Sequence, residues 1–283
     1  MRRILAIAAC ATAVAAVTAV SAAPAQAAPN PVAALKAQFK TGLGVKFNDK
    51  FSTGGEIFSR RTGTFQFGRA GVAASDVTMK FNLKAADIAA MPEEIQPLLK
   101  PEQIIKIGNT AYIKGGILGG LLPEDKTWLR APGGPATGVT GPFGQIINPT
   151  EPATLQKLIK KSKRTGSVYT GKITLGEVYT TSKWMQGALP TEKPTAAQKK
   201  AVISFKVYVN AKGLVVRLVT STKASAVGLE SGIVSADTKF LSWGSKVSIK
   251  APTEGVADID EIDFEGAMSE SSAPLGRAVG RVS

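Results

Sequence analysis

The chain has 283 residues, a formal net charge of +14, one cysteine and no histidine. Without histidine there is no Ser-His-Asp triad, histidine base or ordinary zinc site, and one cysteine excludes a disulfide framework. The length allows one large β domain with a buried core, and the basic charge suits either solubility or attraction to anionic lipids and wall polymers.

The first 27 residues have the pattern of a cleaved export signal. Arg2 and Arg3 precede an apolar run to about Ala23, and Ala25-Gln26-Ala27 supplies the small-x-small cleavage pattern. A transmembrane helix is the alternative, but no Lys or Arg cluster follows the run. We expect cleavage after Ala27 and a secreted or extracytoplasmic protein.

Cys10 lies inside this segment, and Ile7-Ala8-Ala9-Cys10 loosely resembles a lipoprotein cleavage box. Few apolar residues precede it, and cleavage there would leave an apolar Ala/Val tail on the product. We therefore expect no lipid anchor through Cys10.

The mature chain begins with a predicted short helix over 31–40 and then changes to a period of two. Segments 45–51, 64–67 and 77–81 alternate apolar and polar residues, as antiparallel strands with one solvated face do. Gly54-Gly55 and residues 68–71 predict the turns between them.

The middle of the chain mixes short elements with Gly/Pro-rich loops. A helical stripe over 84–99 is interrupted by prolines and predicts one or two short helices crossing the sheet. Strands follow at 104–107, 111–113 and 127–130. The loops 115–123 and 131–149 either border a binding site or are plain surface loops.

Residues 152–164 predict an amphipathic helix with Leu155, Leu158 and Ile159 on one face and a basic face that extends from Lys157 to Arg164. Such a helix can lie on a membrane or an anionic surface. A solvated face packed on a sheet is the interpretation that we prefer.

The last part of the mature chain is mainly strand. Strands are predicted at 167–174, 202–209 and 214–222, a helix at 195–200, and two further strands within 236–250 separated by Gly244. After Pro252 the chain becomes acidic and then Ser/Ala/Gly-rich, which predicts disorder. The expected domains are a signal at 1–27, a β domain at 28–252 and a tail at 253–283.

The candidate motifs for catalysis or cofactor binding all lack a required residue or spacing. The glycines at 115–120 lack the Lys-Ser/Thr of a phosphate loop, and the Ser-Lys pairs lack the Ser-x-x-Lys spacing. Carboxylate pairs lie in a helix and in the acidic tail, where solvation is the usual role. We expect no enzyme, no cofactor and no metal, and we expect a monomer that binds no nucleic acid.

Several segments resemble actinobacterial envelope lipoproteins of the LolA/LppX type, in order from about Val45 to Pro252. They are Asp76 to Lys80, Thr110 to Lys114, Lys126 to Arg130, Val207 to Arg217 and Asp237 to Ile249. The resemblance implies an α+β fold, a half-barrel made of a single large curved antiparallel β-sheet with a few short helices covering its concave face, and a role in binding or moving lipids. Such relatives usually carry an acylated cysteine after the signal, and the equivalent position of this chain, just before Ala28, is not a cysteine.

The expected function is that of a non-catalytic carrier that holds a lipid or another lipophilic molecule in the cell envelope. A basic surface module that binds anionic wall polymers is the alternative. Apolar residues on strand faces are the candidate ligand contacts, although each could equally be ordinary core; they are Phe47, Phe65, Phe67, Met79, Phe81, Ile105, Ile107, Phe205, Val207 and Leu218.

Overall fold

The computed structural model describes residues 29–93, 96–120, 122–134, 143–188 and 193–262. The expected export signal, with Cys10, and the Ser/Ala/Gly-rich tail lie outside the described residues.

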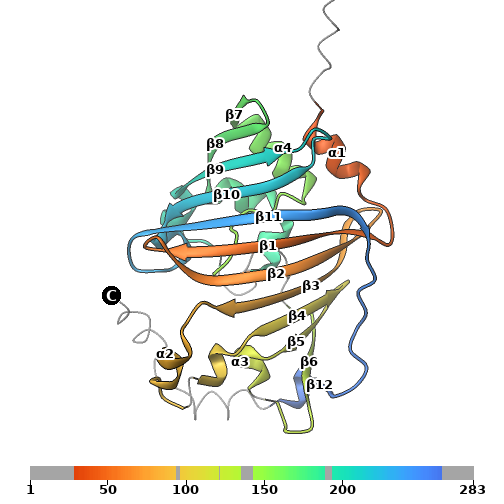
Figure 1. Cartoon of the computed structure of the whole chain (residues 1–283), viewed down its shortest axis with the longest axis vertical. Helices are drawn as coiled ribbons and strands as arrows, with labels where there is room; N and C mark the ends of the chain where they lie inside the picture. The colour runs from red at the N-terminus through yellow and green to blue at the C-terminus, as the bar shows by residue number, and fades with distance from the viewer. Residues whose placement is uncertain (1–28, 94–95, 121, 135–142, 189–192, 263–283) are drawn as a thin grey trace, which may run out of the picture.

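Twelve strands form one sheet. They are β1 Leu43–Thr53, β2 Glu56–Gly68, β3 Gly71–Phe81, β4 Glu102–Ile107, β5 Thr110–Lys114, β6 Trp128–Pro132, β7 Ser162–Thr165, β8 Val168–Thr174, β9 Val202–Val209, β10 Val215–Lys223, β11 Ile233–Lys246 and β12 Val256–Asp258. Their order is β12-β6-β5-β4-β3-β2-β1-β11-β10-β9-β8-β7 (Figure 1), and every neighbouring pair is antiparallel except β12 with β6. The predicted single large antiparallel sheet is confirmed.

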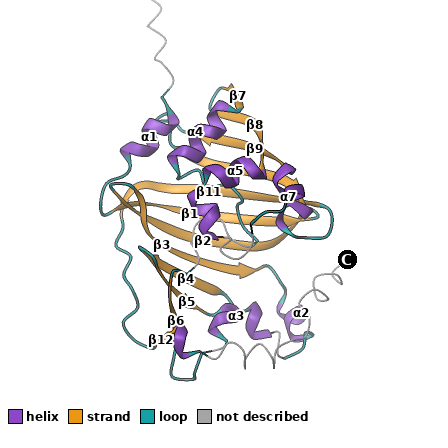
Figure 2. Cartoon of the chain, turned by 180° about the vertical axis from the view of Figure 1, so that it is seen from behind, coloured by secondary structure: helices purple, strands orange, loops and turns teal. Residues whose placement is uncertain are grey.

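Short helices lie on one side of this curved sheet. They are α1 Pro31–Ala37, α2 Ala85–Ala89, α3 Gly116–Gly119, α4 Pro152–Lys160, α5 Leu175–Thr181, α6 Lys183–Ala188 and α7 Ala196–Lys200, with 3-10 turns η1 Gln96–Leu99, η2 Ala224–Val227 and η3 Ile259–Glu261. Figure 2 shows α1, α4, α5 and α7 in front of the half of the sheet that contains β7 to β11, and α2 and α3 near the other end.

Alternation along the strands separates two faces of the sheet. In β1, Val45, Phe47 and Phe51 are buried, whereas Lys46 and Lys50 are exposed. We call the face of Phe47 the inner face, because the helices cover it, and the opposite one the outer face. Successive side chains of a strand point to opposite faces, so the apolar residues at every second position dictate which side is covered.

The main apolar core lies between the inner face and the helices. Phe47, Phe65 and Phe205 from the strands pack in one cluster with Leu155 and Leu158 of α4. Each large apolar side chain that becomes fully buried contributes roughly 1.5–3 kcal/mol to the stability of the fold. This cluster is therefore what holds the helices against the sheet.

The first hairpin is closed by glycines where the backbone requires them. Gly54 and Gly55 have φ of 58° and 91° between β1 and β2. Two consecutive residues with positive φ match the twist of paired strands, and glycine adopts this conformation without steric cost. The turn predicted from the sequence is thus confirmed.

Three predicted elements differ from the structure. The two strands expected within 236–250 are one strand, β11, which bulges opposite Val45, where Ser242 and Gly244 have φ of 55° and 76°. The helix expected over 152–164 ends at Lys160, and Ser162–Thr165 forms the edge strand β7 instead. The helices expected within 84–99 are α2 and η1, at the end of the sheet beyond β3.

Residues 144–150 depart furthest from expectation. The sequence predicts a loop here, but every residue from Gly144 to Thr150 is buried. Ile146 and Ile147 belong to the main apolar cluster, so this segment crosses the inner face as part of the core.

The sheet continues past Pro252, where the sequence predicted the end of the β domain. Val256–Asp258 pairs with Trp128–Arg130 of β6, and Ala257 is buried. Asp258 accepts a hydrogen bond of 2.9 Å from Arg130, and Ile259 and Ile262 pack on the cluster that includes Leu129. The apolar contacts of Ile259 and Ile262 therefore place this acidic stretch against the end of the sheet.

Candidate binding site on the inner face

A polar row crosses the apolar inner face of the sheet. The strand register places its members from β11 to β4 in the order Thr238, Asp49, Arg61 and Glu102, with the apolar Met79 between the last two. The neighbouring row towards the main core is apolar and includes Phe47 and Val77. A charged row between apolar neighbours is costly to bury unless its groups are paired, so it is where specific chemistry is expected.

Asp49 is the well-satisfied member of this row. Its Oδ1 accepts a hydrogen bond of 2.7 Å from the Thr238 hydroxyl, and its Oδ2 accepts one of 3.1 Å from the backbone N–H of Gln145. Burial raises the pKa of Asp49 above its ordinary value, while the Arg61 charge and these hydrogen bonds oppose the increase.

Gln145 ties the crossing segment to the sheet. Its side-chain amide donates to the Thr238 hydroxyl at 3.0 Å and to the Leu218 carbonyl at 3.3 Å, and its carbonyl oxygen accepts from the Thr220 hydroxyl at 2.6 Å. All of these groups are buried, where each unmade hydrogen bond would cost about 1–3 kcal/mol. The network therefore sets the position of residues 144–150 over the polar row.

Within the described residues, the Arg61 side chain makes fewer hydrogen bonds than that of Asp49. Its Nε lies 3.6 Å from Asp49 Oδ2, with the two side chains 6% and 0% exposed. Among the described residues, neither Nε nor Nη2 has a hydrogen-bond partner. Burial lowers the pKa of Arg61, and Asp49 opposes this effect. A guanidinium offers five N–H donors, so this one retains unused capacity in a desolvated place.

Gly144 lies directly against the Arg61 guanidinium. A Cβ at position 144 would be 2.0 Å from Nη2 and 2.2 Å from Cζ. The φ of Gly144 is not in the left-handed region, so space and not backbone conformation requires glycine here.

Two further ionisable groups lie on β4. Glu102 is half-buried, and burial raises its pKa while the Arg61 charge opposes that increase. The Lys106 ammonium donates a hydrogen bond to the carbonyl of Gly134, and burial lowers its pKa. Glu102 is separated from Arg61 by Met79 within the row.

A half-buried apolar wall adjoins the polar row. Phe143 packs on Phe58, Phe81 and Phe51, with ring centroids 5.0, 5.8 and 6.2 Å apart. Phe58, Phe81 and Phe143 are only partly buried, as is Met79, the direct cross-strand neighbour of Arg61. We call the surface made by Phe58, Met79, Phe81 and Phe143 the apolar wall. Partly covered aromatic side chains beside a charged group are typical of sites for amphipathic ligands.

The predicted ligand contacts separate into three groups. Six are fully buried in the main core, namely Phe47, Phe65, Phe67, Phe205, Val207 and Leu218. Met79 and Phe81 lie on the apolar wall. Ile105 and Ile107 lie on the outer face, because Ile104, and not Ile105, pairs with the inward Val77. The structure therefore brings eight of the ten to the inner face, and ligand contact remains a prediction for them.

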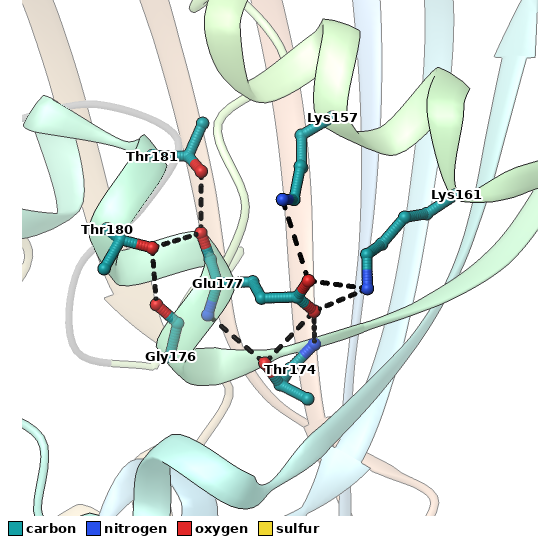
Figure 3. Close-up of polar contacts among 7 residues, drawn as sticks. All are labelled: Lys157, Lys161, Thr174, Gly176, Glu177, Thr180 and Thr181. Carbon is teal, nitrogen blue, oxygen red and sulfur yellow. Dashed lines mark hydrogen bonds and ion pairs between the residues drawn. The ribbon is translucent and has the colours of Figure 1, made fainter.

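The basic face of α4 is partly neutralised within the protein (Figure 3). The Lys161 ammonium lies 2.6 Å from Glu177 Oε1, and that of Lys157 lies 3.7 Å away. Thr174 donates to the same carboxylate through its backbone N–H and its hydroxyl, which completes the capping box of α5. The hydrogen bond from Lys161 contributes most to lowering the pKa of Glu177 to about 2. Two lysines of this basic face are thus engaged in joining α4 to α5.

A separate surface pocket of about 420 Å³ lies between α1 and α4. It is lined by Asn30, Val32, Ala33, Lys36, Gln156, Ile159 and Lys160. The candidate contacts predicted from the sequence are not among these residues.

Sequence reasoning missed Asp49, Arg61 and Gln145. Asp49 occupies an inward position between Phe47 and Phe51, which is the signal that could have identified it. Arg61 was missed because β2 starts at Glu56, eight residues before the predicted strand. Gln145 carried no local signal, since it lies in a Gly/Pro-rich segment.

No protein-family model and no curated protein sequence matches the chain. Among solved structures, LprF from Mycobacterium bovis is 12% identical over 79% of this chain and 97% of its own, with a TM-score of 0.36. A LolA superfamily protein from Nitrosomonas europaea is 7% identical over 79% and 93%, with a TM-score of 0.28. A DUF1329 family protein from Desulfovibrio piger is 9% identical over 78% and 92%, with a TM-score of 0.31.

Within the described ranges, no helix combines the length and apolar character that crossing a bilayer requires.

Proposed function

We propose that this protein is an exported, non-catalytic carrier that holds a lipid or another lipophilic molecule against the apolar wall of the inner face. The export signal predicted at residues 1–27 and the segments that resemble LolA/LppX-type proteins support a role in the cell envelope.

The observation that carries the proposal is the unequal packing of the inner face. Where α4 packs on the sheet, Phe205 of β9 and Leu155 of α4 are fully buried. On β2 and β3, Phe58, Met79 and Phe81 face the same interior but keep part of their surface accessible. An apolar ligand on these side chains would remove that surface from water, at about 25 cal/mol for each Å² covered.

The proposal is tested by native mass spectrometry with organic extraction on the secreted protein, purified without detergent. Phe81→Asp places a charge in the apolar wall, and Ile107→Asp is its matched control, because Ile107 is also half-buried but lies on the outer face. We expect a co-purifying lipid with the wild type and with Ile107→Asp, and a reduced occupancy with Phe81→Asp.

Two results would overturn the proposal. One is a wild-type protein that stays free of lipid even when envelope lipids are offered. The other is equal lipid occupancy in both folded variants, which would show that the ligand does not bind at the apolar wall. Binding that weakens steeply with salt would instead favour a basic surface that binds anionic polymers, because exposed charges are screened and apolar contacts are not.

A further inference from the structure

Arg61 is a buried cation, and two of its nitrogens, Nε and Nη2, have no hydrogen-bond partner among the described residues. Asp49, its ion-pair partner, already accepts hydrogen bonds from Thr238 and Gln145. The Arg61 Nε lies 3.6 Å from Asp49, beyond good hydrogen-bond length, and Nη2 has no partner among the described residues. A desolvated donor of this kind is stabilised by any anion that reaches it.

The position of Arg61 relates this donor to the apolar wall. Met79 is its direct neighbour on β3, and Phe81 lies on the same face one row further along. A ligand whose apolar part covers Met79 and Phe81 therefore lies next to the strand position of Arg61. Ser59 pairs with Phe81 across β2 and β3. Its hydroxyl donates a hydrogen bond to the carbonyl of Phe143 and is a further polar group on this part of the sheet.

We infer that Arg61 recognises the head of an anionic amphiphile, a phosphate or a carboxylate, while the apolar wall holds its hydrocarbon part. The planar guanidinium fork matches the two charged oxygens of either group, whereas the oxygens of a neutral head accept only weaker hydrogen bonds without charge assistance. This inference rests on the proposed function, since it names the class of ligand for the same site.

Glu102 is the group that could oppose such recognition. It lies on the far side of Met79 in the polar row and would repel an anion when ionised. Burial raises its pKa, so the neutral form of this side chain is favoured relative to an exposed glutamate. Glu102→Gln removes the repulsion and is expected to keep or increase the preference for anions.

The test compares lipids that differ only in the head. Dioleoylphosphatidic acid is paired with dioleoylglycerol, and oleic acid with oleyl alcohol, so that the two pairs separate phosphate from carboxylate recognition. Occupancy is measured by native mass spectrometry after transfer from vesicles. We expect the wild type to bind at least one anionic lipid about tenfold more tightly than its neutral partner, as one charge-assisted hydrogen bond implies.

Arg60 supplies the matched control. It is the preceding residue of β2, carries the same charge, lies on the outer face and donates from Nε to Asn82. Arg60→Gln is expected to keep the preference, whereas Arg61→Gln combined with Asp49→Asn, which leaves no buried charge unpaired, is expected to lose it and to keep binding of the neutral lipid. If this double variant does not fold, Arg61→Lys retains the charge but removes the fork, and the preference is expected to fall several-fold.

The outcomes separate the two proposals. A wild type that binds each anionic lipid and its neutral partner equally overturns the role of Arg61 and leaves the carrier function intact. A preference that persists in the folded Arg61 variants also overturns it, as does a loss of the preference in Glu102→Gln. A wild type that takes up none of the four lipids overturns the role of Arg61 as well, whereas the carrier function is overturned only if the secreted protein also yields no lipid on organic extraction. The preference for an anionic lipid over its neutral partner should persist at high salt, because the guanidinium is buried.

Discussion

Asp49 and Arg61 lie directly opposite each other on β1 and β2, with Nε and Oδ2 3.6 Å apart and both side chains more than nine-tenths buried. Removing one partner of a buried pair leaves the other as an uncompensated charge. The Arg217–Asp237 pair provides a comparison, because its side chains are 41% and 31% exposed.

Asp49→Asn is expected to lower the free energy of unfolding by about 3–5 kcal/mol. Asp237→Asn should cost about 1 kcal/mol or less, since exposed ion pairs contribute little. Urea denaturation of both variants measures the difference. Adding Arg61→Gln to Asp49→Asn should recover part of the loss. An equal loss of unfolding free energy for the two aspartate substitutions would show that the buried pair contributes no more to stability than the exposed pair.

The ionisation of Glu177 makes part of the stability of the fold depend on pH. Its pKa is lowered to about 2 in the folded protein, from an ordinary value of 4.5. A depressed carboxyl pKa stabilises the fold above pH 4.5, and this contribution is lost as the pH falls towards about 2. At pH 7 we expect Glu177→Gln to cost about 1 kcal/mol, a value that allows for the partial exposure of the carboxylate.

The check is thermal unfolding of wild type and Glu177→Gln between pH 7 and pH 2. The difference between the two proteins should shrink through this window and vanish near its acid end. The exposed Glu230 serves as control, since Glu230→Gln should follow the wild type throughout. A difference that is independent of pH would assign the effect to the shape of the capping box and not to its charge.

Gly63 makes room for a core aromatic ring. A Cβ at this position would lie 2.5 Å from both Cε1 and Cζ of Phe47, which is fully buried. Overpacking of this kind costs typically 1–3 kcal/mol, so Gly63→Ala should lower the midpoint of urea unfolding. Gly68→Ala, whose Cβ would meet its nearest atom at 3.2 Å, should cost less.

A second substitution tests the cause. Phe47→Leu in the Gly63→Ala background should cost less than Phe47→Leu alone, because the shorter side chain relieves the contact. Strict additivity of the two changes would show that the ring does not obstruct position 63.

The end of the sheet can be tested by truncation. A chain that ends at Ile262 retains β12 and the contacts of Ile259 and Ile262 with the cluster around Leu129. A chain that ends at Pro252 loses all of them and should be less stable by roughly 2 kcal/mol or more, given the apolar area exposed. Equal urea midpoints for the two truncated chains would show that the residues after Pro252 do not contribute to the stability of the β domain.

The sequence by itself determined most strands, because a period of two is a local property. Alternation of Phe47 with Lys46 identified β1 and its buried side, and Gly54-Gly55 identified the turn that follows. The helix at 31–40 and the hairpin made by β9 and β10 were likewise predicted from neighbouring residues alone. The absence of histidine and of a usable cysteine restricted the chemistry before any fold was known.

Tertiary structure alone decided which side chains meet. Every residue from Ile104 to Ile107 except Lys106 is apolar, so alternation could not assign a face, and only pairing with β3 placed Ile105 and Ile107 outside. Asp49 and Arg61 meet through the register of two strands, and Gln145 reaches Asp49 from 96 residues along the chain. Register and long-range crossings depend on the packing of the whole sheet, which a local pattern does not contain.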